Sequence, residues 1–411
     1  MSSLVFGRVK KEARLYNGAA AVSGCLLWAD FAILAALLLT APLPDRAMNF
    51  RLCLPLAAAL LLAACSGQKQ PPAAENPDPL RTIVEENTLP ESQPFFNQMT
   101  AGVGQTGFAA DANVQQFVRY QERANGMDAA ELNRFFNSAV YRPNIIAIMN
   151  RPGTSRPWYA FAKDNTGSLK TNGGRRFYQN NRDALDRIAA EYGVPAGVIA
   201  AVIGIETNYG ANKGSIRLAD SLSTLAFDYP RRGEFFQKEL AEFLLLAKEE
   251  HRDPFEFTGS YAGAMGMPQF MPSSYRKWAV DYDRDGRRDI WNSVPDAAAS
   301  VANYLKAHGW QTGGRMMVPV SLTPTPELSG LMERKTAMDH TVADLKRMGV
   351  QPQEAVADHE KAVLFRLETA PGEYRYYIGL NNFYAVWQYN NSRMYVSAVR
   401  DIANSISGSG L

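Results

Sequence analysis

The chain has 411 residues, 46% of them hydrophobic and 20% charged, which is enough apolar material for one large domain or two smaller ones. Its formal net charge of +2 implies no broad basic surface, so a nucleic-acid partner is not expected. A zinc site is not expected either, because no two histidines have a metal-ligand spacing among His251, His308, His340 and His359.

The N-terminal region has the features of a targeting segment. All the cysteines (Cys25, Cys53 and Cys65) lie within the first 65 residues, so the fold that follows uses no disulfide and no thiol chemistry. Residues 48–64 combine one positive charge, an apolar stretch and small residues ahead of Cys65, which is the form of a secretory signal. They resemble a bacterial lipoprotein signal, in which the cysteine becomes the first mature residue and carries lipid. Ser66 in place of Asp implies the outer membrane by that resemblance; an ordinary signal peptide or a short buried helix is the alternative.

The segments on either side of this signal have different compositions. Residues 25–44 are apolar enough to suggest a membrane helix, apart from Asp30. Two consecutive membrane signals are unusual, so we interpret residues 1–47 as an upstream extension and Met48 as the true start; a real membrane anchor is the alternative. Residues 65–93 are rich in Pro, Glu, Gln and Asn, which predicts a flexible tether between a lipid anchor and a soluble domain.

Residues 94–310 have a largely helical pattern. Asp128, followed three residues later by Glu131, marks a helix start before an amphipathic run. The stretch 181–193 places its apolar residues on one face and ends at Gly193, and the next helix begins at Pro195. We expect further helices at 233–250 and 296–308.

The pattern changes after about residue 311. Residues 316–324 and 361–380 have strand composition, with a turn at Pro371-Gly372, and a short helix at 341–349 lies between them. A last helix is expected around 392–406. The sequence therefore predicts a mainly α (α+β) fold with a helical domain at 94–310, a small α/β subdomain at 311–380 and a C-terminal helical segment at 381–411.

A single carboxylate ends the apolar run from Val198 to Ile205. Ile199, Val202, Ile203 and Glu206 fall at helical spacing, so the acid is expected to point into a core or a cleft. Apolar surroundings favour the protonated form, and a neutral glutamic acid can donate a proton to a leaving group. The alternative is a buried glutamate satisfied by an arginine or by backbone amides, or one that reaches solvent.

The stretch 259–275, "GSYAGAMGMPQFMPSSY", combines glycines with uncharged polar groups and aromatic rings. Ser260, Gln269 and Ser273 offer hydrogen-bonding groups, and Tyr261 and Tyr275 offer flat surfaces. Such groups suit sugar hydroxyls and N-acetyl amides. A tightly packed loop before a helix is the plainer interpretation.

With these motifs in place, the chain resembles the membrane-bound lytic murein transglycosylase B family from about residue 110 to the C-terminus. The resemblance rests on "IGIETNYG", "YPRRGEFF", the stretch 259–275 and "FYAVWQYNNSRMY", in this order. It implies a lysozyme-like α-domain that cleaves the MurNAc–GlcNAc bond of peptidoglycan and leaves a 1,6-anhydromuramoyl end.

The resemblance also implies residue roles. Glu206 becomes the single catalytic acid/base. Ser260 and Gln269 match residues that line the sugar subsites, and Asn390 matches one that orients the N-acetyl group or the developing charge. The tyrosines of the cleft are matched by Tyr304, Tyr389 and Tyr395, and an arginine pair near the peptide or lactyl groups is matched by Arg231 and Arg232, for which a surface pair at a helix start is the alternative.

A lone acid fits this chemistry. Most glycosidases need two carboxylates, and no second acid stands near Glu206 in the sequence, although folding could bring one. In the lytic reaction the substrate's own acetamide and C6 hydroxyl take the second role. No cofactor is needed for catalysis.

Residues 281–292 have acids at positions of an EF-hand loop, which predicts a structural Ca²⁺ site. Position 12 is Asn292 instead of Glu, and the resembling family closes a longer loop with a later Asp, matched here by Asp296. A polar turn neutralised by neighbouring arginines is the alternative. The candidate ligands are Asp281, Asp283, Asp285, Asp289 and Asp296.

Our leading hypothesis is a monomeric, lipid-anchored lytic transglycosylase of the periplasm, held on the inner face of the outer membrane. Its partners would be peptidoglycan glycan strands and, through the anchor, the membrane, with other cell-wall enzymes as further candidates. The alternatives are a hydrolase of the same bond and a non-catalytic peptidoglycan-binding lipoprotein.

Overall fold

The computed structural model describes residues 96, 103–151, 156–334, 336–408 and 410, all of which fall in one compact unit. The predicted extension (1–47), signal peptide (48–64), tether (65–93) and lipidation at Cys65 lie outside these residues and stay predictions. The boundaries at 310 and 380 also stay predictions. The helices are α4 (Val103–Thr106), α5 (Ala112–Asn125), α6 (Ala129–Ser138), α7 (Pro143–Met149), α8 (Trp158–Asn165), α9 (Ser168–Asn180), α10 (Arg182–Tyr192), α11 (Ala196–Thr207), α12 (Leu218–Asp228), α13 (Gly233–Glu249), the 3-10 turn η1 (Pro254–Glu256), α14 (Pro272–Trp278), α15 (Val294–Ala307), α16 (Pro326–Glu333), α17 (Val342–Arg347), α18 (Asn381–Asn390) and α19 (Arg393–Ser407); the strands are β1 (Ile216–Arg217), β2 (Thr258–Gly259), β3 (Met317–Ser321), β4 (His340–Thr341), β5 (Gln351–Pro352), β6 (Lys361–Ala370) and β7 (Glu373–Gly379).

Local signals in the sequence set several helix ends. Asp128 precedes α6, and its carboxylate accepts hydrogen bonds from the backbone N–H groups of Ala130 and Glu131. Gly193 ends α10 in the left-handed conformation, with a φ of 73°. Both boundaries agree with the sequence prediction, because capping and termination depend on residues within one turn.

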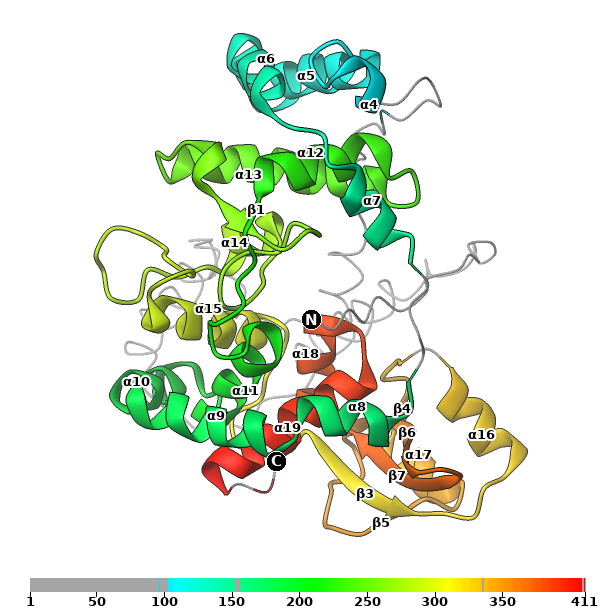
Figure 1. The fold of residues 1–411 in the computed structure, drawn as a ribbon. Coiled ribbons are helices and arrows are strands. Elements are labelled where there is room, and N and C mark those ends of the chain that lie inside the picture. Colours follow the sequence, from blue (N-terminus) through cyan, green and yellow to red (C-terminus); the bar gives the residue numbers. More distant parts are fainter. Residues whose placement is uncertain (1–95, 97–102, 152–155, 335, 409, 411) are drawn as a thin grey trace, which may run out of the picture. The chain divides into compact units, whose positions relative to one another are not determined.

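Helix α11 lies at the centre of the main hydrophobic core. It packs against α9, α10, α15 and α19 (Figure 1), and every residue from Gly197 to Gly204 is buried. Gly197 allows close packing on α19, since an added Cβ would lie 2.9 Å from the carbonyl oxygen of Ala403. The helix that carries Glu206 is therefore fixed from several sides.

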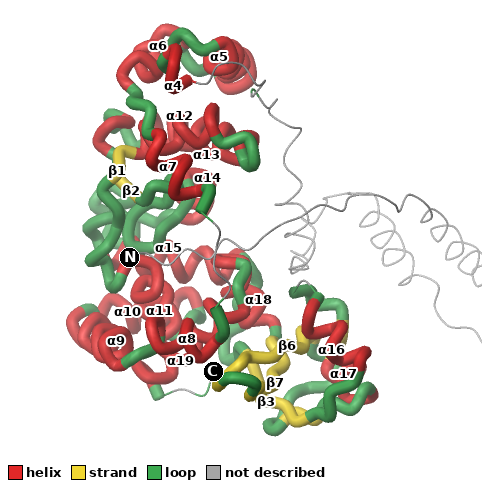
Figure 2. The backbone as a smooth tube through the Cα atoms, turned by 45° about the vertical axis from the view of Figure 1, so that its right-hand side comes forward, coloured by secondary structure: helices red, strands yellow, loops and turns green. Residues whose placement is uncertain are grey.

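The strands form a small antiparallel sheet of order β4-β6-β7-β3-β5, in addition to the two-stranded β1-β2 pair. β6 and β7 are joined by the predicted turn, where Gly372 has a φ of 77°. Helices α16 and α17 pack beside the sheet (Figure 2), and they share with it a second hydrophobic cluster that includes Val318, Leu328, Val342 and Leu364. The mainly α (α+β) fold with a small late sheet is confirmed.

Among the described residues, no single helix is both long and apolar enough to cross a membrane. One bent pair, α10 with α11 at 113°, meets this condition on length and composition.

Candidate active site

Glu206 lies in the last turn of α11 and is half-buried. The helical spacing predicted an inward-pointing acid because one face of the helix appeared apolar. In the structure, however, α11 is buried on all sides, so the spacing does not by itself select the direction of Glu206. The helix ends one residue later. Asn208 and Tyr209 both have left-handed backbone angles, with φ of 53° and 60°, and Gly210 follows with a φ of 86°.

Burial dominates the electrostatics of Glu206. Desolvation raises the pKa of Glu206 from 4.5 to about 7, while a hydrogen bond from Tyr395 and the positive charge of Lys170 lower it in part. The hydroxyl of Tyr395, on α19, donates to Oε1 of Glu206 at 2.7 Å. No other acid within the described residues bonds to or couples with this carboxylate. Near neutral pH the protonated acid and the carboxylate of Glu206 are therefore both populated, so the group can donate a proton as well as accept one.

Lys170, on α9, belongs to this site although the sequence did not point to it. Its Nζ donates to the carbonyl oxygen of Gly204 at 2.7 Å, next to the C-terminal end of α11. Burial lowers the pKa of Lys170, and the nearby Glu206 opposes that shift. The hydroxyl of Tyr209 donates to the Lys170 carbonyl at 2.7 Å. A possible signal was the pair Gly173-Gly174 within the helix, since glycines there mark a close approach, here of the Tyr209 ring.

Close packing at Gly204 leads to a test. An added Cβ would lie 2.5 Å from the ring of Tyr209, which in turn holds Lys170. We expect Gly204→Ala to lower the free energy of unfolding by about 1–3 kcal/mol, because the ring must move within a packed core. Thermal unfolding measures this loss. The matched control is Gly330→Ala on α16, which has open space around it and is expected to be neutral or slightly stabilising; equal losses in both variants would contradict the prediction.

The stretch 259–275, called the polar loop below, lies directly beside the end of α11. Thr207 connects the two, since its hydroxyl oxygen lies 3.0 Å from the Met267 carbonyl oxygen and 3.1 Å from that of Ile203. Gln269 adopts a left-handed backbone with φ of 53°, and its side-chain amide donates to the Gly266 carbonyl at 2.9 Å. The Ser260 hydroxyl oxygen accepts a hydrogen bond from the Ala264 N–H at 3.0 Å. Ser260 and Gln269 are both half-buried, so each keeps an accessible surface.

Two further residues of this stretch have partners that the sequence did not indicate. The hydroxyl of Ser273 donates to Glu239, a buried acid on α13, at 2.7 Å. Tyr275 is buried, and its hydroxyl donates to the Arg288 carbonyl at 2.9 Å. The interpretation of Tyr275 as a flat surface for a sugar was therefore wrong, because the ring is buried. For Ser273, which is half-buried, sugar binding stays a prediction, although its hydroxyl proton is already bound by Glu239. Tyr261 differs, since its hydroxyl is buried without a hydrogen-bond partner among the described residues.

The predicted tyrosines form a connected aromatic group. The Tyr389 hydroxyl donates to the Pro268 carbonyl at 2.6 Å, so α18 also holds the polar loop. Its ring lies 4.8 Å from that of Tyr304 and is nearly parallel to that of Tyr395. Tyr304 is buried, donates to the Gln388 carbonyl and stacks on His308 with ring centroids 3.9 Å apart. The structure thus brings all the predicted tyrosines together next to Glu206.

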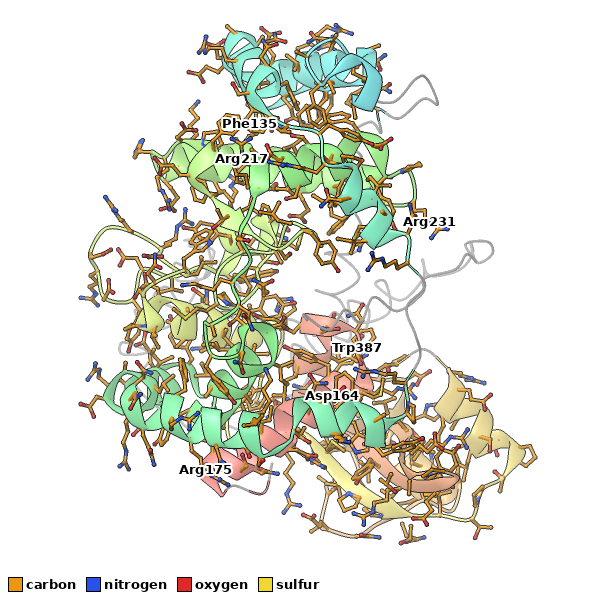
Figure 3. All side chains as sticks on the ribbon, in the orientation of Figure 1. Phe135, Asp164, Arg175, Arg217, Arg231 and Trp387 are labelled. Carbon is orange, nitrogen blue, oxygen red and sulfur yellow. The ribbon has the colours of Figure 1, made fainter. Side chains whose placement is uncertain are left out.

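The remaining predicted residues are less closely connected to Glu206. Asn390 ends α18 half-buried, and its side chain has no hydrogen bond within the described part of the chain. Arg231 is exposed on the loop between α12 and α13 (Figure 3), whereas Arg232 is half-buried with its guanidinium 4.1 Å from the ring centroid of Phe235. The two arginines therefore have different environments.

The acidic loop after α14 brings part of the predicted ligand set together. Carboxylate oxygens of Asp281, Asp283 and Asp296 lie within 4.8 Å of one another. Asp296 is buried, and its two oxygens accept hydrogen bonds from the N–H groups of Tyr282 and Asp289, each at 2.8 Å. Asp285 and Asp289 are not in the cluster. Asp289 instead accepts from the N–H groups of Trp291 and Asn292, at 3.0 and 2.9 Å, as a turn residue does.

Comparison with known proteins identifies the class of molecule to which this fold and site belong. Residues 109–404 match the family model described as the transglycosylase SLT domain. The chain is 35% identical over 360 residues to membrane-bound lytic murein transglycosylase B of Escherichia coli (strain K12), covering 85% of this chain and 95% of that protein. The chain therefore belongs to the SLT transglycosylase family, the enzymes that act as lytic transglycosylases on peptidoglycan.

Solved structures agree with this assignment. The catenated lytic transglycosylase SltB1 from Pseudomonas aeruginosa is 38% identical, with a TM-score of 0.71, and the match covers 73% of this chain and 99% of that one. SltB3 from the same organism, solved in complex with NAG-anhNAM-pentapeptide, is 33% identical with a TM-score of 0.63, over 72% of this chain and 79% of that one. The family resemblance read from the motifs is confirmed.

Proposed function

We propose that this protein cleaves the MurNAc–GlcNAc bond of peptidoglycan with formation of 1,6-anhydromuramoyl ends, using Glu206 as its single acid/base. The observation that carries the proposal is the environment of Glu206. It is a carboxyl whose pKa is raised to about 7 by burial, with a tyrosine hydroxyl and a lysine beside it and no second acid coupled to it within the described residues. A glycosidase that uses two carboxylates needs the second one within about 5–10 Å.

In the proposed reaction, protonated Glu206 donates its proton to the bridging oxygen as the glycosidic bond breaks. The 2-acetamido oxygen of the muramoyl residue supports the anomeric carbon as the bond pair leaves with the GlcNAc oxygen. The Glu206 carboxylate then takes the proton of the muramoyl C6 hydroxyl, whose oxygen bonds to the anomeric carbon and displaces the acetamido oxygen. Glu206 ends the cycle protonated. The intramolecular attack competes with water because its effective concentration is high.

The residues around Glu206 support defined roles. The Tyr395 hydroxyl stabilises the carboxylate in the middle of the cycle, and the Lys170 charge acts in the same direction. We propose that Ser260, Gln269 and Asn390 contact the sugars and their acetamido groups. Tyr389 would form part of the surface that contacts the sugars, while its hydroxyl holds the polar loop at Pro268. The buried Tyr304 packs against the Tyr389 ring and supports it. The exposed Arg231 and the half-buried Arg232 remain candidates for contact with the peptide or lactyl groups of the substrate.

The products of digestion test this proposal. Purified sacculi digested in water enriched in ¹⁸O should yield muropeptides with an anhydro end and without incorporated ¹⁸O. Incorporation of ¹⁸O with a mass increase of one water would instead establish the hydrolase. Binding to sacculi without any soluble product would establish a non-catalytic binding protein. The raised pKa of Glu206, together with its half-buried position and its hydrogen bond from Tyr395, favours the catalytic alternatives, because a binding protein has no need of such an acid.

We also propose that Asp281, Asp283 and Asp296 hold a structural Ca²⁺. The donor set fits this ion, because Ca²⁺ prefers carboxylate and carbonyl oxygens and these three carboxylates converge. Without a cation the cluster would bring like charges together. The ion would tie the loop to the first turn of α15, which carries Asp296, and would not touch the reacting bond.

Calcium is therefore expected to raise the melting temperature of the wild-type protein. Asp281→Asn should abolish most of that increase, because it removes one of the three converging carboxylates. Asp285→Asn is the matched control, since Asp285 lies in the same loop outside the cluster, and it should keep the increase. Calorimetry with Ca²⁺, with Mg²⁺ and with a chelator measures the effect; equal responses from both variants would rule out this ligand set.

For the cellular location, we propose a lipid-anchored enzyme on the inner face of the outer membrane, with the lipid on Cys65. The support is the signal-like sequence before Cys65 and the membrane-bound relative from Escherichia coli. Mass analysis of the mature N-terminus tests both the lipid and the start of the chain.

A further inference from the structure

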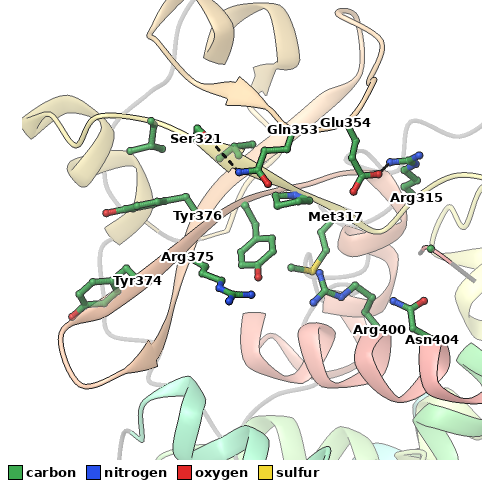
Figure 4. A pocket seen from close by; sticks show the side chains of 15 residues that line it. Arg315, Met317, Ser321, Gln353, Glu354, Tyr374, Arg375, Tyr376, Arg400 and Asn404 are labelled. Atoms are coloured by element: carbon green, nitrogen blue, oxygen red, sulfur yellow. Dashed lines mark hydrogen bonds and ion pairs between the residues drawn. The ribbon is translucent and has the colours of Figure 1, made fainter. Parts of the chain in front are cut away.

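A cavity of about 660 Å³ lies between the sheet and the second half of α19 (Figure 4). Its lining comes from β3, β7, the segment after β5 and α19, and it does not include Glu206 or any residue proposed above for sugar binding. The volume is in the range of sites that hold a small ligand or a few residues of a peptide. Nothing in the proposed reaction uses this cavity.

The charge of the lining is mainly positive. Three arginines line the cavity, Arg315, Arg375 and Arg400, against one acid, Glu354. Arg315 forms an ion pair with Glu354. Arg400 forms one with Asp401 at 2.6 Å, and its guanidinium lies 5.5 Å from the ring centroid of Tyr377. These two arginines are therefore held in place and partly neutralised.

Arg375 is different, because it is exposed and has no hydrogen bond or ion pair within the described residues. Figure 4 shows its guanidinium and that of Arg400 pointing toward one another, from β7 and α19. Two positive groups that face each other repel, and an anion placed between them would be attracted to both. Guanidinium groups bind carboxylates particularly well, since each can donate two parallel hydrogen bonds.

The other side chains of the cavity suit a peptide. The amide nitrogen of Gln353 donates to the Ser321 hydroxyl at 3.1 Å (Figure 4), which leaves the Gln353 carbonyl oxygen to accept from a backbone N–H group and the Ser321 hydroxyl to donate to a backbone C=O group. The side chain of Tyr374, 40% exposed, offers an apolar surface at the same place. A ligand with a carboxylate and several amides fits this lining better than a bare inorganic anion, which would use the arginines alone.

Helix α19 relates this cavity to the candidate active site. Tyr395 donates to Glu206, and Arg400 lies five residues later, which is about 7.5 Å along the axis and about 140° around it. The cavity and Glu206 therefore lie on different faces of one helix. An extended peptide covers about 3.3–3.6 Å per residue, so a few residues exceed the helix diameter of about 10–12 Å.

We propose that this cavity is an accessory site for the carboxylate-bearing peptide stems of peptidoglycan, with Arg375 and Arg400 binding the carboxylate. The inference rests on the proposed function, because it takes peptidoglycan as the substrate. The site holds the wall near the enzyme and takes no part in bond cleavage. It distinguishes peptide-bearing glycan from bare glycan strands.

The test uses Arg375→Glu in a Glu206→Gln background, so that binding is measured without turnover. The substrates are intact sacculi and glycan strands stripped of peptides by an amidase. Arg375→Glu should bind intact sacculi about tenfold more weakly, as the loss of a charged hydrogen bond implies, and bind stripped glycan as before. The control Arg134→Glu makes the same charge change at an exposed position on α6 and should bind both like the parent.

Equal binding of Arg375→Glu and its parent to sacculi would overturn the proposal, and so would an equal loss on both substrates. Vesicles of anionic phospholipid are tested as a third binding partner. A loss of binding confined to these vesicles would also overturn the proposal, because the site would then recognise a membrane. Failure of the proposed function would look different. The enzyme with intact Glu206 would release no anhydro product from either substrate, while the contrast in binding would remain.

Discussion

Glu206→Gln is expected to abolish the release of anhydro-muropeptides from sacculi while leaving the fold intact. The amide keeps the size of the side chain and can still accept the Tyr395 hydrogen bond, but it cannot transfer a proton. General acid/base catalysis contributes about 10²–10⁴-fold to a rate, so at least that loss is expected. Liquid chromatography and mass spectrometry of the released products measure this loss. Persistent activity would contradict the assignment of Glu206 as the acid/base.

Glu239 provides the matched control for this variant. Glu239 is a buried glutamate on α13 whose pKa, like that of Glu206, is raised by desolvation to about 7, but it accepts its hydrogen bonds from Ser273. Glu239→Gln should therefore keep most of the activity. The comparison separates the effect of a buried acid in general from that of an acid in the candidate active site, since the raised pKa alone does not distinguish them.

Both acids also link stability to pH in a definite direction. Their pKa values in the folded protein lie above the ordinary 4.5, so between that value and about 7 the unfolded chain binds fewer protons than the folded one. Stability contributed by the protonated forms is present at low pH and is lost as the pH rises through this window. The melting temperature of either Gln variant, relative to wild type, should therefore increase from acidic to alkaline pH.

Tyr395→Phe is the second variant with a large expected effect, because it removes the hydroxyl that donates to Glu206 at 2.7 Å. That hydrogen bond lowers the pKa of Glu206, so its loss should raise the pKa above its value of about 7. The alkaline limb of the activity profile should move up by about one pH unit, the equivalent of one charged hydrogen bond. The maximal rate should fall as well, because the carboxylate form is less stabilised.

Tyr389→Phe is the comparison for this experiment. Its hydroxyl donates to the Pro268 carbonyl and not to Glu206, so its loss should alter KM through the loop and leave the alkaline limb in place. Rates measured across the pH range on a soluble glycan fragment distinguish the two variants. An unmoved limb in Tyr395→Phe, or an equal shift in both, would show that Tyr395 does not set the pKa of Glu206.

The sequence was most informative where structure depends on neighbouring residues. Asp128, Gly193 and the turn at Gly372 act within one turn of the chain, and all three were predicted correctly. Glu206 could be selected as a candidate because a carboxylate in an apolar helix is rare in any context. Its hydrogen-bond partner could not be predicted from local patterns, because the two residues are 189 positions apart. Tyr395 was predicted as a cleft residue only through the family resemblance.

The residues that the sequence misread or missed share one cause, which is that their contacts lie far away in the chain. Ser273 looked available for a sugar because Glu239, 34 residues earlier, gives no sign in the sequence that it binds this hydroxyl. Lys170 was missed because a lysine early in a helix is normally solvated, and its contact with Gly204 depends on how α9 packs against α11. The hydrogen-bond partners of polar side chains are decided by tertiary packing, and hydrophobic periodicity in the sequence does not reveal that packing.

The burial of α11 on all sides has a consequence for any survey of variants. A library scored by cell-wall cleavage would lose activity at nearly every position from 197 to 204, although none of these side chains takes part in the chemistry. Such a map would mark an entire helix as essential and hide Glu206 within it. Scoring protein abundance in parallel would separate the two effects, because variants at positions 197–204 should lower the amount of protein, whereas Glu206→Gln should leave the amount unchanged while removing the activity.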